Sequence, residues 1–295
     1  MYFSQLRSFQ AVALEGSFTN AAKRLNLSQP TITQQVRQLE MVYGVELFYR
    51  LGRRIELSEV GRSLLTATER LFTMSEEAIE VLESASGQGT GHLRISAVGP
   101  LDVIPVIALV AKANPAARIS LTVCNSEVAQ QSLLEFRADV AMLATAQSDP
   151  RFHYVDFGSR PLVLYVNRDH EWAKWRSVRL RDLHGQKLII REMGSQTRLI
   201  FEQACMEAGI FPLHPIEINN RDAFREAVAH GLGIGVVGDR GLVPDPRLYR
   251  LQISDTYIRM DRRLACLKER CNSRLIRTFL DIGSEVAQQH DEQDT

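Results

Sequence analysis

A strand-like segment followed by a glycine-containing loop carries the densest set of groups suited to binding an anion. The apolar run KLII ends at Arg191, and the helix after it opens with Gly194, Ser195, Gln196 and Thr197. The first N–H groups of a helix have no partner within the helix and attract anions. Arg191 and Arg198 add guanidinium groups that hold a carboxylate or phosphonate through paired hydrogen bonds. Plain helix capping explains Ser195 and Thr197 equally well.

Two further pairs of polar residues precede helix-like segments in the same half of the chain. They are Asn125-Ser126 and Asn219-Asn220. Either pair suits a binding loop, and either alone is also explained as a solvent-exposed helix cap.

The string from Gly233 through Gly235 to Gly238 matches G-x-G-x-x-G, a pattern of dinucleotide sites. A dinucleotide fingerprint follows a strand and opens a helix, whereas these glycines follow the helical pattern RDAFREAVAH and lie in an apolar strand. We therefore expect them to allow close packing of a strand on a helix.

Enzymatic chemistry finds no support in the remaining reactive residues. The histidines are scattered and fit no H-E-x-x-H pattern, and no G-x-S-x-G elbow is present. The cysteines lack the C-x-x-C spacing of a zinc site, so we expect reduced, buried thiols and neither metal nor cofactor; they are Cys124, Cys205, Cys266 and Cys271.

A short helix near the N-terminus presents a polar face suited to nucleic acid. Ile32, Val36 and Leu39 form its buried stripe at spacings of four and three. The opposite face then carries Gln29, Thr31, Thr33, Gln34, Gln35, Arg37 and Gln38. Gln pairs with adenine, Thr methyls touch thymine, and Arg reaches guanine or phosphate in the major groove. A solvated helix face is the plainer alternative.

The elements around this helix favour the DNA interpretation. One helix precedes Gly16, a second follows a Ser17 cap, and Ser28 caps the polar helix with Pro30 in its first turn. The segment VELFYRLGRRIEL then predicts a basic hairpin with Arg50, Arg53 and Arg54. Residues 1–60 hold seven Lys or Arg against five Asp or Glu, so affinity should depend on joining two copies.

A long helix and an α/β region complete the chain. From Ser58 to about Ser84, apolar residues repeat at sevens in two rows, Leu64, Leu71, Ala78 and Leu65, Phe72, Ile79, which predicts pairing of two copies. After the Gly-rich stretch 86–92, strand-like and helix-like runs alternate as in βαβ units, in two lobes with a cleft.

Composition agrees with a folded, two-part chain. The 295 residues are 45% hydrophobic, and 35 Lys and Arg balance 35 Asp and Glu, so net charge gives no attraction to phosphate. The N-terminus lacks a signal-peptide pattern and no apolar run is long enough to cross a membrane, so we expect a cytoplasmic protein.

The segment FQAVALEGSFTNAAKRLNLSQPTITQQVRQLEMVYGVELFYRLGRRIELSEVGR resembles the N-terminal domain of LysR-type transcriptional regulators. That resemblance implies a winged helix-turn-helix, a dimerising linker helix and two α/β subdomains like those of type 2 periplasmic binding proteins. It implies DNA contacts at Ser28, Gln29, Pro30, Thr31, Thr33, Gln34 and Arg37, and in the wing at Arg50, Arg53 and Arg54.

The same resemblance places the effector between the two α/β lobes. Gly99, Pro100 and Leu101 stand where the family commonly has a Ser or Thr ligand contact, which leaves only backbone groups there. The start of the chain and the REMGSQTR loop look somewhat like regulators associated with aminoethylphosphonate catabolism, and a carboxylate or another oxyanion suits the arginines as well.

We therefore expect three parts: a DNA-binding domain over 1–58, a linker helix and hinge over 59–91, and a regulatory domain over 92–295. Its lobes are expected at 92–161 plus 267–295 and at 162–266. The expected function is a DNA-binding regulator modulated by a small anionic metabolite, as a homodimer or homotetramer that contacts RNA polymerase if it activates. The alternatives are a solute-binding protein, an enzyme, or an architectural DNA protein.

Overall fold

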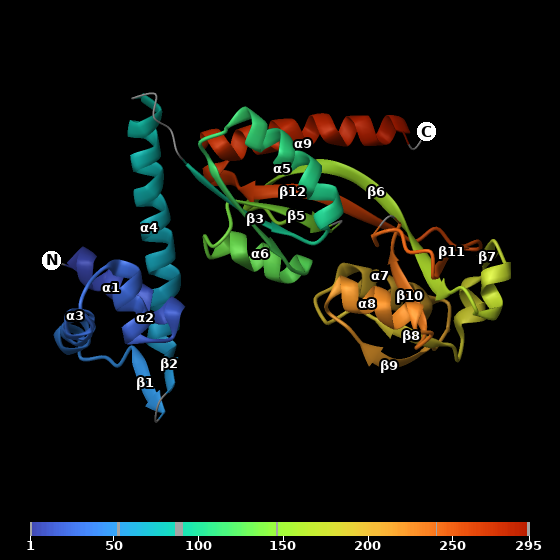
Figure 1. The fold of residues 1–295 in the computed structure, drawn as a ribbon, viewed down its shortest axis with the longest axis horizontal. Coiled ribbons are helices and arrows are strands. Elements are labelled where there is room, and N and C mark those ends of the chain that lie inside the picture. Colours follow the sequence, from blue (N-terminus) through green and yellow to red (C-terminus); the bar gives the residue numbers. More distant parts are fainter. Residues whose placement is uncertain (1, 52–53, 86–90, 146, 240, 294–295) are drawn as a thin grey trace. The chain divides into compact units, whose positions relative to one another are not determined.

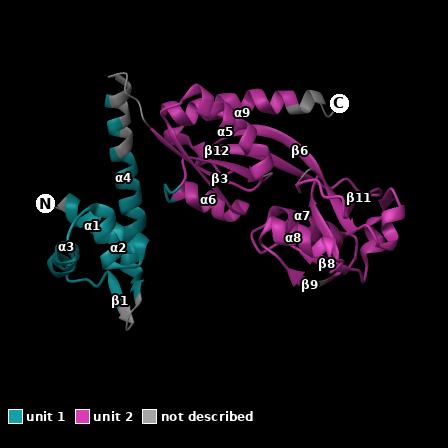
Figure 2. Ribbon diagram, in the orientation of Figure 1, with its two compact units in different colours: residues 1–89, 135–137 teal, residues 90–134, 138–295 magenta. Residues whose placement is uncertain are grey.

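The computed structural model describes residues 2–51, 54–85, 91–145, 147–239 and 241–293. These fall into two compact units, residues 1–89 with 135–137 and residues 90–134 with 138–295 (Figure 2). Each unit is built around its own apolar core, as expected for a chain of this length.

Three helices, a hairpin and a long helix make up the N-terminal unit. Their bounds are α1 (Tyr2–Glu15), α2 (Phe18–Leu25), α3 (Gln29–Tyr43), β1 (Phe48–Leu51), β2 (Arg54–Leu57) and α4 (Glu59–Ala85) (Figure 1). The backbone N–H of Asn20 donates to Ser17 Oγ at 3.4 Å, and that of Thr31 donates to Ser28 Oγ at 3.3 Å. Both predicted N-caps are confirmed.

The turn between α2 and α3 is held by backbone geometry and by a common core. Asn26 takes a left-handed conformation with φ of 53°, and its N–H caps the end of α2. Ile32, Val36 and Leu39 are buried against Phe9 and Ala21. The predicted stripe of the third helix is confirmed, and it fixes which face of α3 remains available.

The start of α4 is fixed by one serine and one glycine. Ser58 Oγ donates to the Glu46 carbonyl at 2.6 Å and accepts from the Gly61 N–H at 2.9 Å. A Cβ on residue 61 would lie 2.2 Å from the Leu47 carbonyl oxygen, so only glycine allows this approach. The predicted linker helix is confirmed and is joined directly to the hairpin of β1 and β2, which pair antiparallel.

The larger unit is an α/β structure with one continuous sheet. The sheet follows the order β4-β3-β5-β12-β6-β10-β8-β9; β11 also pairs with β6, and β7 pairs with β11. Its first elements are β3 (His92–Ala97), α5 (Pro100–Ala113), β4 (Arg118–Val123), α6 (Ser126–Leu134), β5 (Val140–Ala144) and β6 (Phe152–Asn167). The next are η1 (Glu171–Lys174), β7 (Ser177–Val178), η2 (Leu180–Leu183), β8 (Lys187–Ile190), α7 (Gln196–Glu207) and β9 (Leu213–Glu217). The last are α8 (Arg221–Ala229), β10 (Ile234–Gly238), β11 (Leu248–Ile253), β12 (Arg259–Leu267), η3 (Lys268–Arg270) and α9 (Arg274–Gln293).

Two lobes share this sheet, and β6 runs through both. Up to Pro161, β6 pairs with β12, and from Leu162 it pairs with β10. In the first lobe, α5 and α9 lie on one face and α6 on the other, whereas α7 and α8 belong to the second lobe (Figure 1). Separate apolar clusters fill the lobes, around Phe279 in the first and around Phe201 and Phe224 in the second.

The predicted second boundary between the lobes, at 266/267, is wrong. Strand β12 pairs with β5 and β6, so Arg259–Leu267 belongs to the first lobe, and the chain crosses over between β11 and β12. The apolar run LACL predicts a strand but does not say which neighbours that strand pairs with. Strand pairing is long-range, so the sequence pattern could not place the crossing.

The glycine string lies where close packing requires it. A Cβ on Gly235 would lie 2.6 Å from Val228 Cγ2 and 2.8 Å from Phe224 Cε1, both on α8. Gly235 lies in β10, which follows α8 and opens no helix. The packing interpretation is confirmed.

A buried ion cluster secures the first lobe. Asp139 accepts hydrogen bonds from the Arg94 backbone N–H at 2.7 Å and from Arg94 Nη2 at 2.7 Å, and pairs with Arg270 Nη1 at 2.7 Å. Burial alone raises the pKa of this carboxyl, but the hydrogen bonds and charges of Arg94 and Arg270 outweigh burial and hold the pKa below its ordinary value. The carboxylate is therefore charged and fully paired in the folded lobe.

The Asp139→Asn variant should lose about 3 kcal/mol of unfolding free energy, because buried Arg270 and half-buried Arg94 remain without their counter-charge. Scanning calorimetry at pH 7 should show the midpoint of the regulatory unit lower by roughly 6–12 °C. Since the pKa is lowered on folding, the contribution is complete above the ordinary Asp pKa and is lost as pH falls below about 4.

The exposed pair of Asp156 and Arg263 supplies the control for this measurement. The Asp156 side chain is 83% exposed, so Asp156→Asn should leave the midpoint nearly unchanged. Equal shifts for the two variants would show that burial of the pair is not what stabilises the lobe.

Candidate functional site

The polar face of α3 is assembled by hydrogen bonds between its own side chains. Thr33 Oγ1 donates to the Gln29 carbonyl at 3.0 Å, and Gln29 Nε2 donates to Thr33 Oγ1 at 3.2 Å. Ser28 Oγ and Thr31 Oγ1 lie 2.7 Å apart. The predicted DNA-contacting residues of α3 that are exposed are Ser28, Gln29, Pro30, Gln34 and Arg37, while Thr31 and Thr33 are half-buried.

Two glutamines predicted on this face point elsewhere. Gln38 Oε1 accepts from Gln5 Nε2 at 3.0 Å, and Gln35 Oε1 accepts from Ser8 Oγ. Both partners belong to α1, because Gln35 and Gln38 flank the buried stripe of α3 on the side that packs against that helix. The polar face available for DNA is therefore narrower than the helical pattern predicts.

The predicted wing contacts fall largely outside the described residues. Arg53 lies between the described strands, and the side chains of Arg50 and Arg54 are likewise outside the description. The strands that carry Arg50 and Arg54 form the predicted antiparallel hairpin, with Arg50 opposite Ile55 and Leu51 opposite Arg54.

In the regulatory unit, two small pockets adjoin in the cleft between the lobes. The first, the loop pocket, is lined by Cys124, Asn125, Ser126, Ala144, Arg191, Ser195, Gln196 and Thr197. The second, the hinge pocket, is lined by Gly99, Pro100, Leu101, Asp102, Arg160, Gly238, Asp239, Gly241 and Arg262. Val98, Arg221 and Met260 line both. Nine of the predicted effector-binding residues thus lie in one or other pocket.

Four predicted effector-binding residues do not line either pocket and act as supports. Asn220 caps α8 by accepting from the N–H groups of Asp222 and Ala223, each at 2.9 Å. The Asn219 carbonyl accepts from Arg191 Nη2 at 3.1 Å. A Cβ on Gly194, where φ is +83°, would lie 2.6 Å from Glu127 Oε2 of the other lobe. Arg198 is the fourth predicted residue that lines neither pocket.

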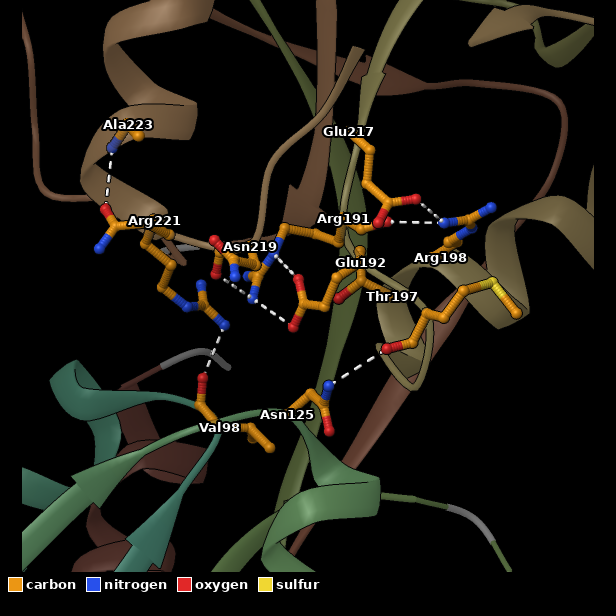
Figure 3. Close-up of polar contacts among 12 residues, drawn as sticks. Val98, Asn125, Arg191, Glu192, Thr197, Arg198, Glu217, Asn219, Arg221 and Ala223 are labelled. Atoms are coloured by element: carbon orange, nitrogen blue, oxygen red, sulfur yellow. Dashed lines mark hydrogen bonds and ion pairs between the residues drawn. The ribbon is translucent and has the colours of Figure 1, made fainter. Parts of the chain in front are cut away.

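Arg191 and Arg198 lie close in sequence but face different surroundings (Figure 3). Arg198 pairs with Glu202 at 2.9 Å and Glu217 at 2.7 Å, and donates to the Arg191 carbonyl at 3.1 Å. Burial works against its charge, but the hydrogen bonds to Glu217 and Glu202 raise the pKa of Arg198. Arg191 borders the loop pocket and pairs with Glu192 at 2.9 Å. The prediction that Arg198 binds the effector is therefore corrected, because the Glu217 carboxylate on β9 turns this side chain away.

Arg221 is the residue of the cleft that the sequence patterns did not select. It is the first residue of α8, and its Nη2 donates to the Val98 carbonyl at 2.8 Å (Figure 3). Its Nη1 donates to the Gly241 carbonyl at 2.7 Å. Among the described residues Arg221 forms no ion pair. Burial, together with the nearby charge of Arg191, lowers the pKa of Arg221 to about 10. A desolvated guanidinium satisfied only by carbonyls favours an incoming anion.

The lobes are in contact across the cleft. Arg221 on the second lobe bonds Val98 on the first, and Asn125 Nδ2 donates to the Met193 carbonyl at 3.2 Å. Each pocket encloses about 20 Å³, close to the space that one water molecule occupies. Both pockets are therefore small while these contacts are in place.

The cysteines differ from their predicted burial in part. Cys205 and Cys266 are buried, and burial raises the pKa of Cys205 to about 11 and of Cys266 to about 12. Cys124 and Cys271 are only half-buried, and Cys124 lines the loop pocket. The described residues contain no cluster of three His, Cys, Asp or Glu side chains able to hold a metal ion.

Together, a winged helix-turn-helix and a two-lobed α/β domain define a DNA-binding regulator with a ligand cleft. Residues 3–62 match the bacterial regulatory helix-turn-helix proteins of the lysR family, and residues 86–288 match the LysR substrate binding domain. The chain belongs to the LysR family of transcriptional regulators. Its relatives are regulators and not enzymes.

Relatives and solved structures agree with this assignment. The chain is 32% identical over 294 residues to a RuBisCO operon transcriptional regulator of Allochromatium vinosum, covering 97% of each. It is 32% identical to the activator CmpR of Synechocystis, covering 79% of this chain and 77% of CmpR. The fold is similar to full-length CbnR in complex with its target DNA, with a TM-score of 0.72 and 24% identity over 97% of this chain and 100% of CbnR. It is also similar to the regulatory domain of Synechocystis CcmR in complex with 2-PG, with a TM-score of 0.62 and 25% identity over 68% of this chain and 98% of that domain.

Of the helices in the described part of the chain, none combines the length and the apolar character needed to cross a bilayer.

Proposed function

We propose that this LysR-family regulator reads operator DNA with α3 and the wing, and that a small anionic metabolite bound in the cleft modulates it. The observation that supports an anionic effector is the environment of Arg221, a desolvated guanidinium held by the Val98 and Gly241 carbonyls. The DNA half rests on the exposed face of α3, where Gln29, Gln34 and Arg37 project side by side at helical spacing. We place this activity in the cytoplasm, where the DNA lies.

The functional unit we propose is a homodimer paired through α4. Leu71, Met74, Ile79 and Leu82 recur along α4 and are 39% to 70% exposed. The beginning of α4 is engaged with its own domain, since Leu64 and Leu65 pack on the DNA-binding core and the rings of Phe3 and Phe72 lie 4.9 Å apart. An apolar stripe that its own chain leaves open suits a second copy. Further pairing of regulatory domains would give the homotetramer, and an activating form would contact RNA polymerase.

The loop pocket has the chemistry to bind the anionic group. It lies at the start of α7, where Ser195, Gln196 and Thr197 line it together with Arg191. The Ser195 side chain makes no capping hydrogen bond, so its hydroxyl is available to a ligand. N–H groups at a helix start and a guanidinium edge both favour a phosphonate or carboxylate. 2-Aminoethylphosphonate is therefore one candidate beside other small oxyanions, and the CcmR complex supports a small molecule in a domain of this fold.

The proposed mechanism is a shift between two arrangements of the lobes. Because Arg221 and Asn125 bridge the lobes, a ligand that competes for these groups binds one arrangement better than the other. That preference changes how the regulatory domains pair and thus the spacing of the two DNA-binding units. The effector thereby alters operator binding.

The Arg37→Ala variant should bind the DNA upstream of its own gene at least about tenfold more weakly, because one arginine contact to base or phosphate is worth about 1–3 kcal/mol. Fluorescence anisotropy at two salt concentrations measures this and tells base from phosphate contact by the salt slope. Arg277→Ala removes a comparably exposed helical arginine from α9 and should bind as wild type. Unchanged binding by the Arg37 variant would argue against α3 as the reading element.

A thermal-shift panel should identify an anion that stabilises the regulatory unit, because a ligand specific to the folded state raises its midpoint. The panel comprises 2-aminoethylphosphonate, inorganic phosphate, sulfate and small carboxylates. Arg191→Gln should abolish the shift, while Arg198→Gln, which changes an arginine outside both pockets, should keep it. If Arg198→Gln alone removed the shift, the assignment of the anion to the loop pocket would be wrong.

A further inference from the structure

The hinge pocket holds two arginines on the strands that join the lobes. Arg160 lies in β6 just before this strand changes partner, and Arg262 lies in β12 at an irregularity of register between Asp261 and Arg263. A bulge of this kind redirects a side chain. The guanidinium of Arg262 lies 5.5 Å from the centre of the Phe157 ring, inside the sheet and helix core of the first lobe.

Both arginines pair with the same carboxylate. Asp102 Oδ1 lies 3.0 Å from Arg160 Nη2 and 2.8 Å from Arg262 Nη1. The side chains of Arg160 and Arg262 are only 9% and 5% exposed. Arg160 also donates through Nη1 to the Asp239 carbonyl at 3.3 Å. Within the described part of the chain, its buried Nε has no hydrogen-bond partner.

The charges around the hinge pocket do not balance. Arg221 is the third guanidinium in its wall, whereas Asp102 is the carboxylate that neutralises the pair. The Asp239 carboxylate also lies in the wall, but it is bound at 2.7 Å by Arg250, a fourth arginine. Among the described lining residues, three guanidinium groups therefore face one carboxylate that is not already paired with an arginine from outside the pocket. Buried charge that is not matched favours the entry of an anion.

Asp102 occupies the place that an anion would take at the start of α5. It is in the first turn of that helix, and its Oδ2 would lie 2.9 Å from a Cβ on residue 99, so the carboxylate lies directly against the helix start. The cap residue Gly99 has no side chain to satisfy the helix N-terminus. The Asp102 carboxylate thus acts as an internal counter-ion for both the helix end and the arginine pair.

We propose that the hinge pocket is a second anion subsite, so that the effector carries two anionic groups on a short linker, one in each pocket with Arg221 between them. This inference rests on the proposed function of the cleft as an anion site. Arg221 joins the two subsites because it lines both pockets, and Val98 and Met260 form the rest of the shared wall. An anion at Arg160 and Arg262 contacts β6 and β12, the strands at the two crossings between the lobes, and therefore acts directly on their arrangement.

The test measures anion binding to the full chain by titration calorimetry. The probes are acetate and inorganic phosphate, with one anionic group, and malonate, succinate and phosphonoacetate, with two. The best two-ended probe should bind at least about tenfold more tightly than acetate, the change that about 1.4 kcal/mol from a second charge-assisted contact produces. Arg160→Met should remove that advantage. Arg263→Met, which alters the outward-facing neighbour of Arg262, should retain it.

A gain of binding provides the second arm of the test. Asp102→Asn removes the internal counter-ion without changing side-chain size, so inorganic phosphate should bind this variant at least about tenfold more tightly than wild type. The double variant Asp102→Asn with Arg160→Met removes one charge of each sign and should bind phosphate no better than wild type. The double variant also keeps the test decisive if Arg160→Met alone fails to fold.

The outcomes separate this inference from the proposed function. If Asp102→Asn leaves phosphate binding unchanged and two-ended probes bind no better than acetate, while Arg191→Gln still weakens both, the second subsite is refuted and the cleft remains an anion site. If the wild type and Asp102→Asn both bind none of the probes, the two proposals fall together. Tighter phosphate binding by Asp102→Asn, with a two-ended preference that depends on Arg160, supports the second subsite.

Discussion

An arginine that is removed from water needs a compensating negative charge. The regulatory unit contains one place where a carboxylate supplies that charge and another, in the cleft, where it does not. In the first lobe Asp139 pairs with both Arg94 and Arg270, and its pKa is held below the ordinary value, which keeps the cluster charged. In the cleft, Arg221 is satisfied by carbonyl oxygens, which compensate a positive charge only in part. The same type of side chain therefore stabilises the lobe in one place and prepares it for a ligand in the other.

The topology makes the cleft sensitive to what binds there. Strand β6 is continuous through both lobes, and the chain returns between β11 and β12, so just two crossings join the lobes in the described structure. Arg160 and Arg262 lie at these crossings, and Arg221 and Asn125 bridge the cleft beside them. A charge introduced at this point acts on the few elements that set the arrangement of the lobes. Under the proposed mechanism, binding in these small pockets and rearrangement of the lobes occur together.

Local patterns allowed most of the elements to be predicted from the sequence. Ser17 and Ser28 cap their helices because a hydroxyl placed before an apolar pattern has a local partner within three residues. The glycines of the GIGVV strand were interpreted correctly because the order of strand and helix is itself a sequence property. The buried stripe of α3 likewise follows from spacing alone.

Features that depend on distant partners were predicted poorly. Arg191 and Arg198 look equivalent in sequence, and the carboxylate that turns Arg198 away, Glu217, comes from another strand. Gln35 and Gln38 lie on the polar side of a helical wheel, yet Ser8 and Gln5 of α1 bind them. The position of β12 in the first lobe and the bulge at Arg262 arise from strand register, which no local pattern specifies.

Anion binding in the cleft and DNA binding by α3 are coupled in the proposed mechanism. The most direct measurement titrates the full chain onto its own upstream DNA, by anisotropy and footprinting at fixed salt, with and without a saturating anion that raises its thermal midpoint. The anion should change the affinity of the protein for its DNA or the footprint on that DNA. Bound DNA should in turn change the affinity for the anion, since coupling between two sites is mutual. Identical affinities and footprints with the anion bound would contradict it.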